Sequence, residues 1–222
     1  MAADPGPARH ALAWIRPDRR AAVRAGDPAH QADAARWLAL DRPAVARRRD
    51  PATAPGEVAL GIVLPAARGR ARVALVAPSD AVARVAPPLR LAEALASAPP
   101  PWAAPLAALE AEAHRAGIVL RVYGSLAWQH LTGEAYLRPG SDVDLIAPGA
   151  SEAERARSLA LLGRWAAHAS PRLDGEIDLG AGRAVAWREL LAPRARVLVK
   201  AGASVTLEPL AEALGGSAGG GA

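Results

Sequence analysis

Residues 118–146 read IVLRVYGSLAWQHLTGEAYLRPGSDVDLI, and their pattern predicts the fold of the region around them. The first part of this stretch, 118–123, is an apolar run rich in β-branched residues and predicts a buried strand that leads directly into Gly124-Ser125. Residues 126–131 suit one or two helical turns, and residues 141–146 predict a second strand. The stretch therefore predicts a strand, a Gly-Ser turn, a short helix and a second strand in that order.

The two acidic residues of this stretch point to a metal. Asp142 and Asp144 stand two residues apart, so in a strand both carboxylates face the same side, where they require a cation. Paired oxygen ligands suit Mg²⁺, with Mn²⁺ as the alternative ion, and Mg²⁺ commonly shares its coordination with substrate phosphates. A competing interpretation gives these acids only a capping or turn-stabilising role, which leaves Asp144 without a purpose inside an apolar strand.

The Gly-Ser pair predicts a phosphate site. At the start of a helix, Gly124 and Ser125 offer free backbone N–H groups, a hydroxyl and the positive end of the helix dipole. These are the groups that hold a phosphate. We therefore expect a phosphate-bearing substrate beside the two acids.

A third acid is expected on a later strand. Residues 151–154 form a Ser-x-x-Glu capping box that opens a helix through about residue 168, and residues 173–179 follow as a strand. Asp174, Glu176 and Asp178 alternate along this strand and face the same side. The pattern alone leaves open which of the three joins the first two acids.

Three consecutive prolines at residues 99–101 predict a domain boundary, because proline cannot continue a helix and stiffens a connection. We expect a smaller N-terminal α+β domain at 1–98, a catalytic α/β domain at 102–214 and a disordered glycine-rich tail at 215–222. The elements expected before the boundary are an apolar segment at 11–15, a helix at 31–40, a hairpin formed by 58–64 and 72–77, and a helix at 82–98. Those expected after it include a helix at 105–116, a turn at 180–182, and apolar segments at 184–191 and 197–199.

The composition is that of a folded soluble protein. Of the 222 residues, 51% are hydrophobic and 22% are charged, which argues against disordered, collagen-like and coiled-coil classes. The chain has no cysteine, which excludes disulfides, thiolate zinc sites and cysteine nucleophiles. Long apolar runs and a signal-peptide layout are missing, so we expect a cytoplasmic protein without a membrane partner. The net charge of +5 favours acidic or phosphorylated partners.

The Gly-Ser turn and the Asp-x-Asp strand together resemble the nucleotidyltransferase superfamily that includes DNA polymerase β. In that superfamily the turn holds a triphosphate, and two acids plus a third on a neighbouring strand bind two metal ions. The resemblance implies a polymerase-β-like fold for residues 102–214. The spacer at 126–141 is longer than is usual in the superfamily, which points to a subfamily.

The sequence motifs of the chain are similar to those of the malonate decarboxylase holo-acyl-carrier-protein synthases, which are phosphoribosyl-dephospho-CoA transferases. The motifs that carry this resemblance are YGSLAWQHLTG at 123–133, YL at 136–137, SDVDL at 141–145, RHAL at 9–12, LDGE at 173–176, AVAWREL at 184–190 and VLVK at 197–200. They extend over nearly the whole chain. The resemblance implies transfer of 2′-(5″-phosphoribosyl)-3′-dephospho-CoA from its 5″-triphosphate precursor to a serine of the apo acyl-carrier subunit of malonate decarboxylase, with release of diphosphate.

The resemblance also implies roles for individual residues. Asp142 and Asp144 are expected to be catalytic and to bind the metal, with Glu176 as the third ligand because it matches the Asp-Gly-Glu wording, and Asp178 as its alternative. The expected substrate-binding residues are Gly124, Ser125, Trp128, Gln129 and Lys200. A simpler interpretation of Trp128 is that it packs its helix against the core. Lys200 is the sole lysine of the chain, and its simpler interpretation is a solvated residue at the end of a strand.

Three other functions compete with this one. The carrier of citrate lyase bears the same prosthetic group, so it is an alternative acceptor. A minimal nucleotidyltransferase that uses ATP keeps the fold and changes the donor. A basic nucleic-acid-binding module with degenerate acids needs aromatic residues interleaved with basic ones, and the chain has only two tyrosines and six scattered tryptophans. Nucleic acid is therefore not the expected partner.

Overall fold

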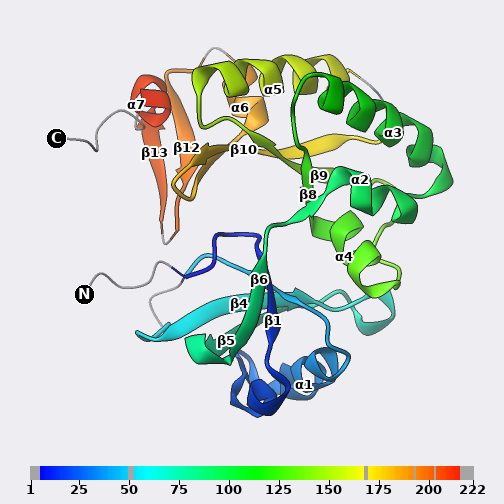
Figure 1. Cartoon of the computed structure of the whole chain (residues 1–222), viewed down its shortest axis with the longest axis vertical. Coiled ribbons are helices and arrows are strands. Elements are labelled where there is room, and N and C mark those ends of the chain that lie inside the picture. Colours follow the sequence, from blue (N-terminus) through cyan, green and yellow to red (C-terminus); the bar gives the residue numbers. More distant parts are fainter. Residues whose placement is uncertain (1–5, 50–52, 168–169, 193, 203, 216–222) are drawn as a thin grey trace. The chain divides into compact units, whose positions relative to one another are not determined.

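The computed structural model describes residues 6–49, 53–167, 170–192, 194–202 and 204–215, and these form two compact units (Figure 1). Unit 1 takes the described residues up to Pro88 and also Leu131–Tyr136. Unit 2 takes Leu89–His130 and the described residues from Leu137 onward. Of the expected tail at 215–222, residues 216–222 lie outside the described residues, and Gly215 is the last residue of a helix.

Unit 1 is built on a six-stranded sheet with the order β2-β5-β4-β3-β1-β6, whose strands pair antiparallel. The strands are β1 (Leu12–Ile15), β2 (Arg24–Ala25), β3 (Ala44–Ala46), β4 (Glu57–Val63), β5 (Arg72–Pro78) and β6 (Val82–Ala86). The helical elements are α1 (Gln31–Ala39) and the 3-10 turns η1 (Pro17–Ala22), η2 (Pro28–His30), η3 (Ala66–Arg68) and η4 (Ser79–Ala81). The expected helix at 31–40 and the hairpin with Gly69 in its loop are confirmed.

The prediction of a helix at 82–98 is wrong. This segment contains β6, then β7 (Leu89–Arg90), one turn of helix α2 (Leu91–Ala94) and the 3-10 turn η5 (Leu95–Ser97). Pro87 and Pro88 interrupt the alanine and leucine spacing, and the β-branched Val82 and Val85 before them suit an extended strand. Composition at helical spacing is a weak signal where proline divides the segment.

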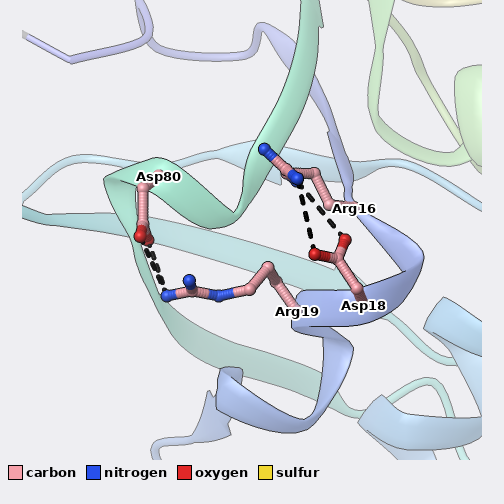
Figure 2. A network of polar contacts seen from close by, with 4 residues as sticks. All are labelled: Arg16, Asp18, Arg19 and Asp80. Atoms are coloured by element: carbon pink, nitrogen blue, oxygen red, sulfur yellow. Dashed lines mark hydrogen bonds and ion pairs between the residues drawn. The ribbon is translucent and has the colours of Figure 1, made fainter.

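The surface of unit 1 carries short ion pairs around η1 and η4 (Figure 2). Arg16 binds Asp18 at 3.3 Å, and Arg19 binds Asp80 at 2.9 Å, which ties η1 to η4. The hydrogen bond from Arg16 lowers the pKa of Asp18. All four side chains are well exposed, so these pairs contribute little to stability.

Unit 2 contains a seven-stranded sheet with the order β13-β12-β11-β10-β9-β8-β7. Its strands after β7 are β8 (Arg121–Tyr123), β9 (Val143–Pro148), β10 (Leu173–Gly180), β11 (Arg183–Ala186), β12 (Arg196–Lys200) and β13 (Val205–Pro209). Its helices after α2 are α3 (Pro100–Arg115), α4 (Gly124–Thr132), α5 (Glu152–Trp165), α6 (Trp187–Leu191) and α7 (Leu210–Gly215). The two sheets make the chain a mixed α/β protein, as expected.

The triple proline lies inside unit 2, where Pro99 caps α3 and Pro100 is its first residue. A helix start needs no backbone N–H groups, so prolines fit there and do not separate the units. Helix α3 thus begins earlier than expected and includes Pro105 in its interior.

Strands β9 and β10 are parallel, and the remaining neighbours in this sheet are antiparallel. Helix α5 makes the crossover between β9 and β10. The capping box is confirmed, because the Ser151 hydroxyl accepts a hydrogen bond from the Glu154 N–H at 3.2 Å and the Glu154 carboxylate accepts one from the Ser151 N–H at 3.0 Å.

One face of this sheet packs into the core of unit 2, and the other carries the acids. Val143, Leu145 and Ala147 of β9 are buried in one cluster with leucines of α3 and α5. The alternate residues Asp144 and Ile146 therefore lie on the opposite face. A Cβ on Gly175 of β10 would lie 2.6 Å from the backbone nitrogen of Leu145, so only glycine lets the two strands approach this closely.

No helix among the described residues is long and apolar enough to span a membrane.

Candidate active site

The Gly-Ser turn and Asp144 meet at one point. Strand β8 leads directly into α4, and Tyr123 at its end pairs with Asp144 across the antiparallel ladder. Gly124 has a φ of +68°, and a Cβ on it would lie 2.9 Å from the carboxyl carbon of Asp144. The carboxylate therefore lies against the α-carbon of Gly124, in space that any other residue would fill.

Asp142 stands one residue before β9 rather than within it. Its carboxylate accepts two hydrogen bonds from Arg172, one of them from Nε at 2.6 Å, and the other from Nη2. Arg172 immediately precedes β10, and its carbonyl accepts a hydrogen bond from the Val143 N–H at 2.9 Å. Asp142 raises the pKa of Arg172, so the guanidinium stays charged.

Sequence reasoning missed Arg172. The available signal was its position directly before the strand that carries the later acids, since parallel neighbours begin at the same edge of a sheet. The parallel pairing of β9 and β10 is a tertiary feature, and it is what brings Arg172 to Asp142.

The three candidate third acids have different surroundings. In the register of β10 with β9, Asp174 lies opposite Asp144, and Glu176 lies opposite Ile146. Asp174 accepts a hydrogen bond from the Gly175 N–H at 2.8 Å, and Asp178 accepts one from the Gly180 N–H at 2.9 Å. Among the described residues, no three His, Asp or Glu side chains lie close enough together to hold a metal ion.

Glu176 and Lys200 form an ion pair. The Glu176 side chain is 3% exposed, and its Oε1 lies 2.6 Å from Lys200 Nζ at the end of β12. A buried carboxylate requires such a partner, because desolvation disfavours its charge. Neither interpretation of Lys200 from the sequence included this pair.

The two remaining candidates lie on α4. Trp128 is 6% exposed, which is what the packing interpretation expects. The Gln129 side chain joins two backbone segments, because its Nε2 donates to the Ser97 carbonyl at 2.8 Å and its Oε1 accepts from the Leu137 N–H at 3.3 Å. The Gln129 side chain thus helps to hold α4 in place.

The arrangement combines three features: the start of α4, where the first N–H groups have no partner within the helix, the Asp144 carboxylate against it, and the side chains of Arg172 and Lys200, each paired with an acid. Such a set suits chemistry on a phosphorylated substrate, since the helix start favours negative charge and the carboxylate can accept a proton. The comparisons with known proteins agree with this chemistry. The profile of the phosphoribosyl-dephospho-CoA transferase MdcG N-terminal domain matches residues 8–88, and that of the MdcG C-terminal domain matches residues 90–211.

The chain belongs to the phosphoribosyl-dephospho-CoA transferase family. A phosphoribosyl-dephospho-CoA transferase of Xanthomonas campestris pv. campestris is 42% identical over 192 residues, which cover 86% of this chain and 89% of the relative. One of Bradyrhizobium diazoefficiens is 43% identical over 143 residues, which cover 64% of this chain and 63% of the relative. No solved structure matches the chain. The two family profiles meet at residues 88–90, where the two units also divide.

Proposed function

We propose that the chain transfers 2′-(5″-phosphoribosyl)-3′-dephospho-CoA from its 5″-triphosphate to a serine of the apo acyl-carrier subunit of malonate decarboxylase, and that it releases diphosphate. The observation that carries the proposal is the Asp144 carboxylate lying against Gly124 at the start of α4. Phosphoryl transfer to a hydroxyl needs a phosphate site and an acid side by side. Membership of the transferase family supports the substrate class.

We further propose a polymerase-β-like nucleotidyltransferase fold for unit 2. The support is the order of its parts. The Gly-Ser turn follows β8, the Asp-x-Asp motif stands at the start of β9, and the acid-bearing β10 runs parallel beside β9.

In the proposed reaction, the serine oxygen of the acceptor forms a bond to the α-phosphorus of the donor. The bond from that phosphorus to the bridging oxygen breaks, and the diphosphate leaves with its electron pair. The N–H groups of Gly124 and Ser125 bind phosphate oxygens, and the helix dipole favours their charge. Asp144 accepts the serine proton.

Asp142 and Asp144 are the residues that would hold Mg²⁺, because their carboxylates are hard oxygen donors. Glu176 fits this role less well, since Lys200 already neutralises its buried carboxylate. When bound, the ion would lower the pKa of the serine hydroxyl and offset the charge of the departing diphosphate.

The test is the intact mass of purified apo carrier after incubation with the chain, Mg²⁺ and the triphosphate precursor. We expect a mass increase equal to the phosphoribosyl-dephospho-CoA adduct, and none with Asp144→Ala. Asp178→Ala is the matched control, because Asp178 is an exposed acid of the neighbouring strand, and it should still transfer.

Two further arms separate the alternatives. The apo carrier of citrate lyase replaces that of malonate decarboxylase in one arm, and faster labelling of the citrate lyase carrier would overturn the choice of acceptor. ATP replaces the precursor in the other arm. A nucleotide adduct from ATP, with none from the precursor, would overturn the proposed donor.

A further inference from the structure

Three elements of unit 2 place their ends at one edge of its sheet. Strand β8 ends at Tyr123 and runs antiparallel to β9, so the Gly-Ser turn that follows it lies beside the start of β9. Strands β9 and β10 are parallel and begin at the same edge. Asp142 stands directly before β9, and Arg172 stands directly before β10. The start of α4, the Asp-x-Asp motif and the Arg172 guanidinium therefore share this edge.

The side chain of Arg172 has the reach to serve a phosphate at the start of α4. Neighbouring strands lie about 4.8 Å apart, so β8 and β10, with β9 between them, are separated by about 10 Å. An extended arginine side chain covers most of this distance, and a bound phosphate group covers the rest. The Arg172 side chain is exposed, so it can change its direction without leaving a packed position.

The contact between Arg172 and Asp142 occupies the groups that a phosphate and a metal ion would use. Arg172 donates from Nε to one oxygen of the Asp142 carboxylate at 2.6 Å, and from Nη2 to the other. Both oxygens are thus taken while the pair exists. A phosphate group presents two oxygens to the same fork of donors, and the fork binds a phosphate as well as a carboxylate. Because the guanidinium is exposed, the pair contributes little to stability and exchanges easily.

We propose that Arg172 is a phosphate-binding residue that exchanges Asp142 for the diphosphate portion of the donor. In the free chain the guanidinium covers Asp142, and in the complex it binds phosphate oxygens and leaves the carboxylate open to a cation. Binding of the donor and binding of the metal ion then support each other, because each removes a competitor of the other. The identity of the donor rests on the proposed function, whereas the exchange concerns only Arg172, Asp142 and a diphosphate group.

Isothermal titration calorimetry of the full chain with inorganic diphosphate, in the absence of metal, tests the exchange. Arg172→Gln should weaken the binding about tenfold, because charge-assisted hydrogen bonds are lost. Asp142→Asn should tighten it about threefold, because the guanidinium no longer has to leave an exposed ion pair. The matched control is Arg164→Gln, since Arg164 is also an exposed arginine of unit 2 that pairs with an acid, Glu112, and this variant should bind diphosphate like the unchanged chain. Unchanged affinity in Arg172→Gln would overturn the proposal.

The double variant Asp142→Asn/Arg172→Gln separates the exchange from a general effect of charge. Asp142→Asn also removes a negative charge near the anion, and that effect would persist whether or not Arg172 is present. The exchange instead requires Arg172, so the gain in diphosphate affinity from Asp142→Asn should disappear in the Arg172→Gln background. An equal gain in both backgrounds would show that the guanidinium is not exchanged, and the proposal would then be wrong.

Steady-state kinetics links the exchange to transfer. Arg172→Gln should raise the KM for the triphosphate precursor about tenfold and leave the KM for the carrier unchanged. If the unchanged chain does not use the precursor, but the diphosphate titrations show the coupling between Arg172 and Asp142, the proposed function fails and the exchange stands. If the unchanged chain transfers normally and Arg172→Gln binds diphosphate with the same affinity, the exchange fails alone.

Discussion

Asp142, directly before β9, and Glu176, in the neighbouring strand β10, each bind a basic side chain, but their surroundings differ. Asp142 binds Arg172, whose side chain is 69% exposed. Glu176 is 3% exposed and binds Lys200, whose side chain is 37% exposed. The first pair is open to solvent on the side of Arg172, with the Asp142 side chain 20% exposed, and in the second pair the carboxylate is almost fully buried.

This difference separates two roles that the sequence grouped together. An exposed ion pair contributes at most about 1 kcal/mol, so a metal ion or a phosphate can compete for either partner. Removing one partner of a buried pair costs about 3–5 kcal/mol, because the other charge is left uncompensated. We therefore assign a chemical role to Asp142 and Asp144, and a structural role to Glu176 and Lys200.

We expect the strongest loss of activity when a side chain is added at Gly124, beside Asp144. Gly124→Ala would force a Cβ into the Asp144 carboxylate, and a displacement of this size lowers the rate of transfer about 100-fold. Gly182→Ala is the control, since Gly182 has a similar φ of +72° and open space around it. Rates from mass spectrometry should fall for the first variant only, and equal rates would show that the contact is unimportant.

Removing the partner of the buried Glu176 carboxylate should lower the stability of the fold. Lys200→Met leaves the Glu176 carboxylate buried without its cation, so we expect the free energy of unfolding to fall by about 3 kcal/mol. Arg183→Met, which removes a half-buried partner of Glu208 on nearby strands, should cost less. Urea denaturation measures both variants. Equal losses of stability would show that the burial of Glu176 does not make its ion pair more important than the pair of Arg183 with Glu208.

The smallest effect is expected at the open pair. Arg172→Gln should change the free energy of unfolding by less than about 1 kcal/mol, because the guanidinium is exposed. Arg19→Gln, at the surface pair with Asp80, should behave the same way (Figure 2). Only Arg172→Gln should bind Mn²⁺ more tightly, as measured by electron paramagnetic resonance, since it frees Asp142. Unchanged Mn²⁺ binding would show that the pair does not compete with the ion.

Local signals in the sequence were sufficient for much of unit 2. The capping box at 151–154 is a short-range pattern, and the structure has it. The Gly-Ser turn after an apolar strand is also local, and α4 begins there. Trp187 lies in the apolar segment expected at 184–191, and it is fully buried.

The remaining features depend on contacts between distant residues. Nothing near Lys200 in the sequence indicates Glu176, because their strands are joined only through the sheet register. Asp142 was expected inside a strand, but β9 begins at Val143, where pairing with β10 begins. Residues 131–136 fall inside the catalytic domain expected at 102–214, and their packing in unit 1 is visible only in three dimensions.

The most direct measurement compares Asp144→Asn with Glu176→Gln in the transfer reaction, at matched concentrations of folded protein. The apo carrier is incubated with the precursor and Mg²⁺, and the adduct is followed by intact mass. We expect Asp144→Asn to form no adduct, and Glu176→Gln to form it at a rate close to that of the unchanged chain. Adduct formation by Asp144→Asn, or its absence with well-folded Glu176→Gln, would contradict the assignment of chemistry to the open acids.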